Sequence, residues 1–150
     1  MSTWAQFAAA ASEQSEFGRR RLEGPIAYLA TVRRDGSPRV HPVTPFVAGE
    51  RLIVYMEPTS PKASDLRREP RFALHCGVED NSGGQGEFLI TGRAAEITDP
   101  SIREEVFERA RRLGYNPRER YVVFELRIEE AMSTTYEGDS PKRTRWKSLE

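Results

Sequence analysis

The chain of 150 residues contains 23 Lys and Arg and 23 Asp and Glu residues, so its formal net charge is zero although 31% of its residues are charged. A neutral total excludes a polybasic nucleic-acid binder, which needs excess positive charge to displace counterions from phosphates. The length suits one domain, residues 1–150. Leu, Ile, Val and Phe together make only 31 residues, so we expect a modest core that a second subunit can extend.

Cysteine and hydropathy patterns narrow the class further. The single cysteine, Cys76, excludes an intramolecular disulfide and a multi-cysteine zinc site. No apolar stretch approaches the roughly 20 residues of a membrane span, and we find no signal-peptide pattern. We therefore expect a cytoplasmic protein that binds neither nucleic acid nor membrane.

The first residues have a helical period. Trp4, Phe7, Ala8 and Ala11 recur at helical spacing and predict a helix over residues 3–17, which Gly18 ends. The run Arg19–Arg21 is typical of a solvated connector.

From residue 25 to about residue 136 the apolar period is mostly two, which predicts a barrel. Asp35-Gly36 and Gly49 predict turns. Pro42 and Pro45 each remove a ladder donor, so the strand that contains them must lie at an edge or carry a bulge. The predicted strands are Ile26–Val32, Arg39–Val47, Arg51–Glu57, Phe72–Val78, Glu87–Ile97 and Tyr121–Ile128, with Ala131–Tyr136 as an extension.

Two further helices and three polar segments complete the pattern. Ser60 caps a helix that begins at Pro61 and ends near Glu69. Asp99 and Pro100 begin another helix, whose buried face we assign to Ile102, Val106, Ala110 and Leu113. Residues 79–86 and 114–118 form loops, and residues 137–150 form a tail that is polar except for Trp146 and Leu149. Six or seven short strands with few helices predict a small antiparallel barrel with peripheral helices.

Few groups suit acid–base or nucleophilic catalysis. Cys76 lies in an alternating strand and is typical of a buried structural cysteine. His41 and His75 lack the spacing of a metal site, so we expect no metal. The G-x-S-x-G, Walker and G-x-G-x-x-G motifs are absent, and the glycines of Ser82–Gly86 join strands and do not open a helix.

The segment Ser60-Pro61-Lys62 offers more specific chemistry. A lysine in the first turn opposes the helix dipole, and a bound anion would relieve that conflict. The alternative is an ordinary cap with an exposed lysine. Arg39, on a neighbouring strand, could meet this helix start and complete a phosphate pocket. The alternative for Arg39 is a strand residue that faces solvent.

The segment from Ala27 to His75 resembles a known family. It contains the pattern L-A-T-V-x-x-D-G-x-P-R-V, a second strand, and then S-x-K-x-x-D-L-x-x-x-P-R. This order is similar to the pyridoxamine 5′-phosphate oxidase-like family of flavin-binding proteins. The resemblance implies a mainly β (α+β) fold, a six- to seven-stranded antiparallel split β-barrel with peripheral helices. It also implies a homodimer that holds flavin mononucleotide (FMN) at the subunit interface.

The resemblance assigns cofactor-binding residues. Arg39 and Lys62 would hold the phosphate with help from Ser60. Trp146 resembles aromatic C-terminal positions that approach the flavin in some members, and the alternative is that it packs the tail onto the barrel. The residues implied to line or adjoin the flavin ring are Val40, His41, Pro42, Val43, Thr44, Tyr55 and Met56.

The end of the chain departs from the family pattern. It reads Arg143-Thr144-Arg145-Trp146-Lys147, without the R-x-H pattern expected for substrate binding in authentic pyridoxamine phosphate oxidases. Oxidation of vitamin B6 is therefore not expected. We expect an FMN-dependent oxidoreductase acting on a small molecule, with His41 and Thr44 tuning the ring. The alternatives are a reductase that uses a deazaflavin coenzyme, whose anionic tail Arg19–Arg21 would grip, and a flavin- or haem-binding protein without turnover.

Overall fold

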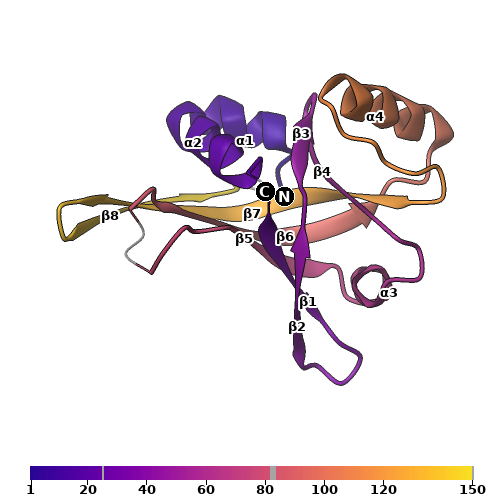
Figure 1. The fold of residues 1–150 in the computed structure, drawn as a ribbon, viewed down its shortest axis with the longest axis horizontal. Helices are drawn as coiled ribbons and strands as arrows, with labels where there is room; N and C mark the ends of the chain where they lie inside the picture. Colours follow the sequence, from indigo (N-terminus) through magenta and orange to yellow (C-terminus); the bar gives the residue numbers. More distant parts are fainter. Residues whose placement is uncertain (25, 82–83, 150) are drawn as a thin grey trace.

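A computed structural model describes residues 1–24, 26–81 and 84–149. It is mostly β, with one antiparallel sheet that curls into a half-barrel (Figure 1), which confirms the expected split barrel. The strands follow the order β2-β1-β5-β6-β7-β4-β3, and β8 pairs with β7. Of the predicted positions, Pro25, Ser82, Gly83 and Glu150 lie outside the described residues. The strands are β1 Ala27–Val32, β2 Pro38–Val43, β3 Phe46–Ala48, β4 Arg51–Met56, β5 Arg71–Cys76, β6 Glu87–Glu96, β7 Val122–Glu137 and β8 Ser140–Lys147.

The strand predicted over Arg39–Val47 is two strands in the structure. β2 pairs with β1, whereas β3 pairs with β4 at the other end of the strand order. The chain leaves the first ladder at Thr44 and Pro45, where proline lacks the N–H that would continue it. The expectation that the prolines keep this segment at an edge is confirmed, since both strands end the path.

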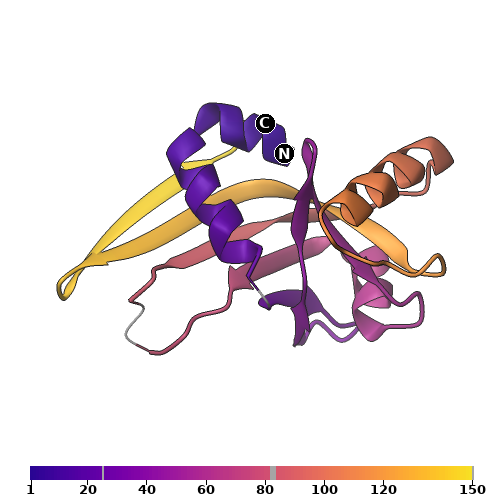
Figure 2. The same ribbon diagram turned by 45° about the horizontal axis from the view of Figure 1, so that its top comes forward.

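The predicted polar tail is wrong over most of its length. β7 continues without interruption to Glu137, and β8 returns beside it from Ser140 to Lys147. Gly138 makes the turn with a φ of 64°. Both faces of β8 are largely exposed, so its sequence shows no alternation of apolar and polar residues. The strand is recognised only from its backbone pairing with β7. The β7–β8 hairpin extends from the side of the barrel (Figure 2).

The N-terminal helix predicted over residues 3–17 is two helices, α1 Trp4–Ala10 and α2 Ser12–Leu22. Thr3 and Gln6 form a capping box at the first, and Ala11, with φ of −143° and ψ of 66°, separates the two. Gly18 does not end a helix. It lies inside α2, where the helix packs closely on the ring of Phe88. A Cβ at this position would overlap that ring, so only glycine permits this packing. Arg19–Arg21 therefore belong to the last turns of α2 and not to a connector.

The other two helices begin where predicted. α3 spans Pro61–Arg68 with Ser60 as its cap, and α4 spans Pro100–Arg112 with Asp99 as its cap. The assignment of Leu113 to the buried face of α4 is wrong. Leu113 is the C-terminal cap and is 54% exposed, because the helix has already ended there.

The core lies on one side of the curled sheet. α1 and α2 supply Trp4, Phe7 and Leu22 to the larger cluster, which also contains Leu29 of β1 and Phe88 of β6. α4 covers a second cluster, formed by Phe46, Ala48, Ile53, Ile97, Val106, Ala110 and Val123. None of the described helices is both long enough and apolar enough to span a bilayer.

Candidate functional site

One cavity of about 390 Å³ lies where β2, β4, α3 and the α4–β7 loop meet. We call it the aromatic cavity. Pro42, Val43 and Thr44, at the end of β2, form one wall, and Tyr55 of β4 forms another. The lining residues are Pro42, Val43, Thr44, Phe46, Tyr55, Lys62, Tyr115, Asn116, Pro117 and Tyr121.

Stacked rings give the aromatic cavity a planar wall. The ring centroids of Phe46 and Tyr115 are 4.2 Å apart with planes inclined by 21°, and those of Phe46 and Tyr55 are 6.1 Å apart at 14°. Burial raises the pKa values of both Tyr55 and Tyr115. Their hydroxyls therefore stay protonated near neutral pH and can donate hydrogen bonds to a ligand.

Lys62 brings a positive charge to this cavity without a counterion. Its side chain is half-buried, and burial lowers the pKa of its ammonium group. Within the described part of the chain, no carboxylate lies within ion-pair distance of its Nζ atom. An anion would recover the electrostatic stabilisation that burial removes from Lys62.

Arg39 is fixed by a buried carboxylate that the sequence analysis missed. Its Nε donates to Oδ2 of Asp65 at 2.7 Å, and Asp65 also accepts from Thr31 Oγ1 at 2.8 Å and from Arg68 Nη2 at 3.2 Å. Burial alone would raise the pKa of Asp65. The hydrogen bonds from Arg39, Thr31 and Arg68 outweigh burial and lower this pKa below its ordinary value. The ionised carboxylate therefore orients Arg39 and leaves its terminal nitrogens available.

Arg39 lines a second cavity, of about 450 Å³, which lies between the β1–β2 turn and α3. We call it the arginine cavity; its lining is Arg33, Arg34, Asp35, Arg39, Pro61, Ser64, Asp65 and Arg68. The consecutive residues Pro61 and Lys62 line different cavities, so the first turn of α3 separates the two. His41 is within electrostatic reach of both. Burial, and then the charges of Lys62 and Arg39, lower the pKa of its imidazole, which keeps the ring neutral near pH 7.

Five predicted site residues do not line either cavity: Val40, His41, Met56, Ser60 and Trp146. Val40 is 62% exposed on the face of β2 that Pro42 shares, and Met56 is buried in the core. Ser60 accepts a hydrogen bond from the backbone N–H of Ala63 as the helix cap. Trp146 packs against Phe7, with ring centroids 4.9 Å apart, so within its own subunit it holds β8 against α1.

Arg19–Arg21, assigned as an alternative grip for an anionic tail, already have partners within the chain. Arg19 pairs with Glu16 at 2.6 Å and with Glu23 at 2.8 Å. Arg21 donates to the carbonyl oxygen of Gly77 at 2.8 Å. Among the described residues, the cations that line the two cavities without an ion-pair partner are Arg33 and Arg34 of the β1–β2 turn and Lys62 of α3.

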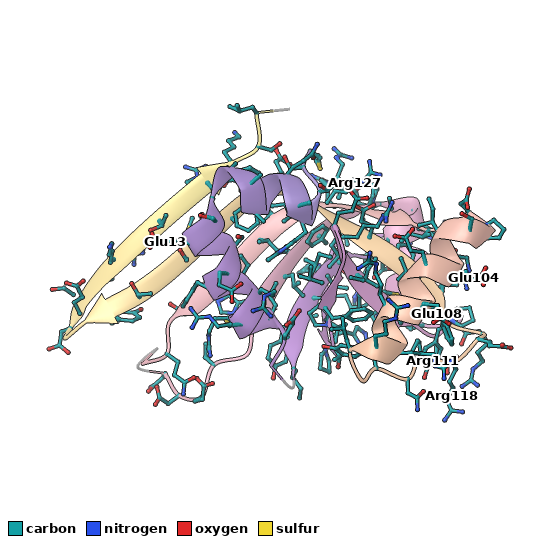
Figure 3. The ribbon with its side chains drawn as sticks, turned by 90° about the horizontal axis from the view of Figure 1, so that it is seen from above. Glu13, Glu104, Glu108, Arg111, Arg118 and Arg127 are labelled. Atoms are coloured by element: carbon teal, nitrogen blue, oxygen red, sulfur yellow. The ribbon has the colours of Figure 1, made fainter. Side chains whose placement is uncertain are left out.

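Sequence reasoning missed the wall that comes from the α4–β7 loop. Tyr115, Asn116 and Pro117 reach the cavity because Tyr115 N–H bonds to the Ala110 carbonyl oxygen and folds the loop back. Figure 3 shows Glu104 and Glu108 on α4 and Arg118 in the loop, at the end of the molecule away from the β8 hairpin. The sequence did contain a sign that Asp65 belongs to the site. Asp65 follows Lys62 by three residues in a predicted helix, and residues at that spacing lie near the same helix face.

Comparison with solved structures supports the fold. A haem-binding protein from Mycobacterium smegmatis has a TM-score of 0.65 at 17% identity over 87% of this chain, which spans 57% of that protein. A NimC/NimA family protein from Clostridium acetobutylicum has a TM-score of 0.64 at 18% identity, covering 87% and 92% of the two chains. HutZ, the haem storage protein of Vibrio cholerae, has a TM-score of 0.61 at 20% identity, covering 79% and 89%.

Comparison of the sequence with curated proteins finds no match. Comparison with protein families gives a match to pyridoxamine 5′-phosphate oxidase over residues 14–134. That range contains both quoted motifs and reaches from α2 into β7. The resemblance found in the sequence is therefore confirmed, and the chain belongs to the pyridoxamine 5′-phosphate oxidase family.

Proposed function

We propose that this protein is an FMN-dependent oxidoreductase that acts on a small molecule. The observation that carries the proposal is Lys62, a half-buried ammonium group that lines the aromatic cavity and has no counterion among the described residues. We assign the planar ring to the side of the Phe46–Tyr115 stack, and the phosphate to Lys62 and the oriented guanidinium of Arg39 on either side of the first turn of α3. When bound, the flavin supplies hydride or electron transfer.

The chain's own residues would bind and orient the cofactor. The protonated hydroxyls of Tyr55 and Tyr115 can donate hydrogen bonds, and the neutral imidazole of His41 can donate or accept one. Thr44, at the end of β2, offers a hydroxyl to the polar edge of the ring. We assign no acid or base in the chain to proton transfer.

We propose in addition that the functional unit is a homodimer with the flavin at its interface. Pro42, Tyr28, His75, Leu89 and Met132 lie in register across β2, β1, β5, β6 and β7. They share the face opposite the core, because side chains alternate along a strand. Four of the five side chains are apolar or aromatic and Tyr28 is 46% exposed, and apolar groups gathered on an exposed face are typical of a subunit interface. Pro42 belongs to both this row and the aromatic cavity.

A flavin titration tests the cofactor assignment. Lys62→Met and Arg39→Ala should each weaken FMN binding by about 1.5–3 kcal/mol, because each removes a charge-assisted hydrogen bond. Lys142→Met, at an exposed lysine of β8, is the matched control and should bind FMN like the wild type. Riboflavin, which has no phosphate, should bind the wild type and Lys62→Met equally. If riboflavin binds the wild type as tightly as FMN does, the phosphate site is wrong.

The same titration separates the alternatives. A deazaflavin coenzyme that displaces FMN would favour a deazaflavin-dependent reductase. Binding of haem, and not of flavin, would favour a haem-binding protein without flavin chemistry. Flavin that binds but is not reduced by NADH or NADPH under anaerobic conditions, and does not turn over, would leave a binding protein only.

Sedimentation tests the dimer separately. Tyr28→Asp places a charge in the exposed row and should shift the protein from dimer to monomer. Leu113→Asp, at an exposed apolar residue on the end of α4, is the matched control and should leave the oligomeric state unchanged. A wild-type protein that sediments as a monomer at all concentrations would refute this part of the proposal.

A further inference from the structure

The arginine cavity has more positive charge than a single cofactor phosphate requires. Four guanidinium groups, of Arg33, Arg34, Arg39 and Arg68, line it together with two carboxylates. The cavity therefore has an excess of two positive charges, in a chain whose total charge is zero. Its volume of about 450 Å³ leaves room for a ligand group beyond Arg39.

Neither carboxylate forms an ion pair with the turn arginines Arg33 and Arg34, although the charge of Arg33 contributes to lowering the pKa of Asp35. Asp65 already accepts from Arg39 and from Arg68. Asp35 accepts from the backbone N–H of Ser37 at 3.0 Å and from its hydroxyl at 2.6 Å, so it stabilises the turn. Asp35 therefore has a structural role inside the hairpin.

Arg33 and Arg34 are the available groups. Neither guanidinium makes a hydrogen bond or ion pair with any residue that the structure describes, and both side chains are exposed. Like charges held on one rim repel one another, and an anion between them removes that repulsion. The Ser64 hydroxyl, across the cavity on α3, can donate to the same anion.

We propose that the arginine cavity binds a second phosphate-class anion, separate from the phosphate assigned to Lys62 and Arg39. This rests on the proposed function for the position of the first phosphate. Lys62 lines the aromatic cavity and Arg39 lines the arginine cavity, on the two sides of the first turn of α3, so the second anion would lie on the Arg39 side, beside Arg33 and Arg34. The second anion belongs either to a cofactor longer than FMN or to a phosphorylated nucleotide that delivers electrons.

Calorimetric titration with inorganic pyrophosphate tests the cavity directly, on protein saturated with FMN. We expect binding that weakens at high salt, since the contacts are partly exposed. The double variant Arg33→Ala/Arg34→Ala should bind pyrophosphate at least tenfold more weakly. Arg111→Ala/Arg112→Ala is the matched control, because it removes two consecutive arginines at the end of α4 that line neither cavity. Both double variants should unfold at the wild-type temperature.

Two further titrations distinguish the sources of the anion. If FAD binds the FMN-free protein more tightly than FMN does, and loses that advantage in Arg33→Ala/Arg34→Ala, the anion belongs to a longer cofactor. If NADPH binds the FMN-loaded protein and competes with pyrophosphate, it belongs to a nucleotide reductant. Pyrophosphate that fails to bind the wild type, or binds Arg33→Ala/Arg34→Ala equally well, overturns the inference. Arginine-dependent pyrophosphate binding in a protein that does not bind FMN would refute the proposed function and leave the anion cavity standing.

Discussion

Replacing Asp65 with asparagine tests whether one buried carboxylate organises the candidate site. Asparagine has nearly the same shape and keeps an oxygen for Thr31, but it removes the charge that holds Arg39 and Arg68. Breaking a buried ion pair costs about 3–5 kcal/mol. The Arg39 and Arg68 side chains are 23% and 29% exposed, so water recovers part of this loss. We expect Asp65→Asn to lower the free energy of unfolding by about 2–3 kcal/mol, or roughly 5–10 °C in Tm.

Urea unfolding near neutral pH, at one fixed protein concentration, measures this loss. Asp35→Asn is the matched control, since Asp35 is an exposed aspartate on the adjacent turn that bonds only to Ser37 among the described residues. The control keeps an oxygen acceptor for both hydrogen bonds from Ser37 and should unfold close to the wild-type urea concentration. Asp65→Asn should also weaken FMN binding several-fold, because Arg39 is no longer held in place.

The pH dependence adds an independent check. The folded-state pKa of Asp65 lies below its ordinary value, near 3.9 in an unfolded chain. Its contribution to stability is therefore complete above about pH 4 and is lost as the pH falls through the folded-state value. The difference between wild type and Asp65→Asn should be constant from pH 7 to about pH 5 and should shrink in more acidic buffer. Equal stability of the two proteins at neutral pH, or a difference that does not shrink in acid, would refute the reasoning.

Three other perturbations address the packing and the sheet. Gly18→Ala should destabilise the protein by about 1–3 kcal/mol despite the higher helix propensity of alanine, because its Cβ overlaps the buried Phe88 ring; urea unfolding measures this. His75 has a pKa raised to about 8, chiefly by hydrogen bonding to Cys76. The stabilisation that protonated His75 provides is therefore complete below about pH 6.5 and is lost as the pH rises through 8. His75→Gln should make the free energy of unfolding, measured by urea unfolding, less dependent on pH across that range. Trp146→Ala should release α1 from β8, seen as faster amide exchange in residues 4–10, without changing FMN affinity.

Local signals account for the parts of the fold that the sequence predicts well. Ser60 followed by Pro61 marks the start of α3, because a hydroxyl cap and a residue without N–H both suit that position. Asp35-Gly36 marks the first hairpin, and Gly36 takes a φ of 86° there. These choices depend on neighbours in the chain and need no knowledge of tertiary contacts.

The features that were missed depend on partners distant in the sequence. Glycine is typical of helix ends, so the sequence alone predicts that Gly18 ends a helix. Only the position of Phe88 in the fold shows that Gly18 is there to permit close packing. β8 carries charged residues on both faces and gains its order from the backbone ladder with β7. Tyr115 becomes part of the site because β4 pairs with β7 and brings the preceding loop beside Phe46. A residue pattern alone cannot supply these pairings.

The distribution of charge connects the neutral composition with the candidate site. Twenty of the 23 cationic residues are arginines, and many are matched to a carboxylate, as in the surface pairs of Arg67 with Glu96 and Arg145 with Glu130. Lys62 differs, because it is half-buried and no described carboxylate neutralises it. Lys62, Arg33 and Arg34, which pair with no carboxylate in the described part of the chain, lie on the two sides of one helix start. Zero net charge for the whole chain is therefore compatible with a local excess of positive charge around that helix start.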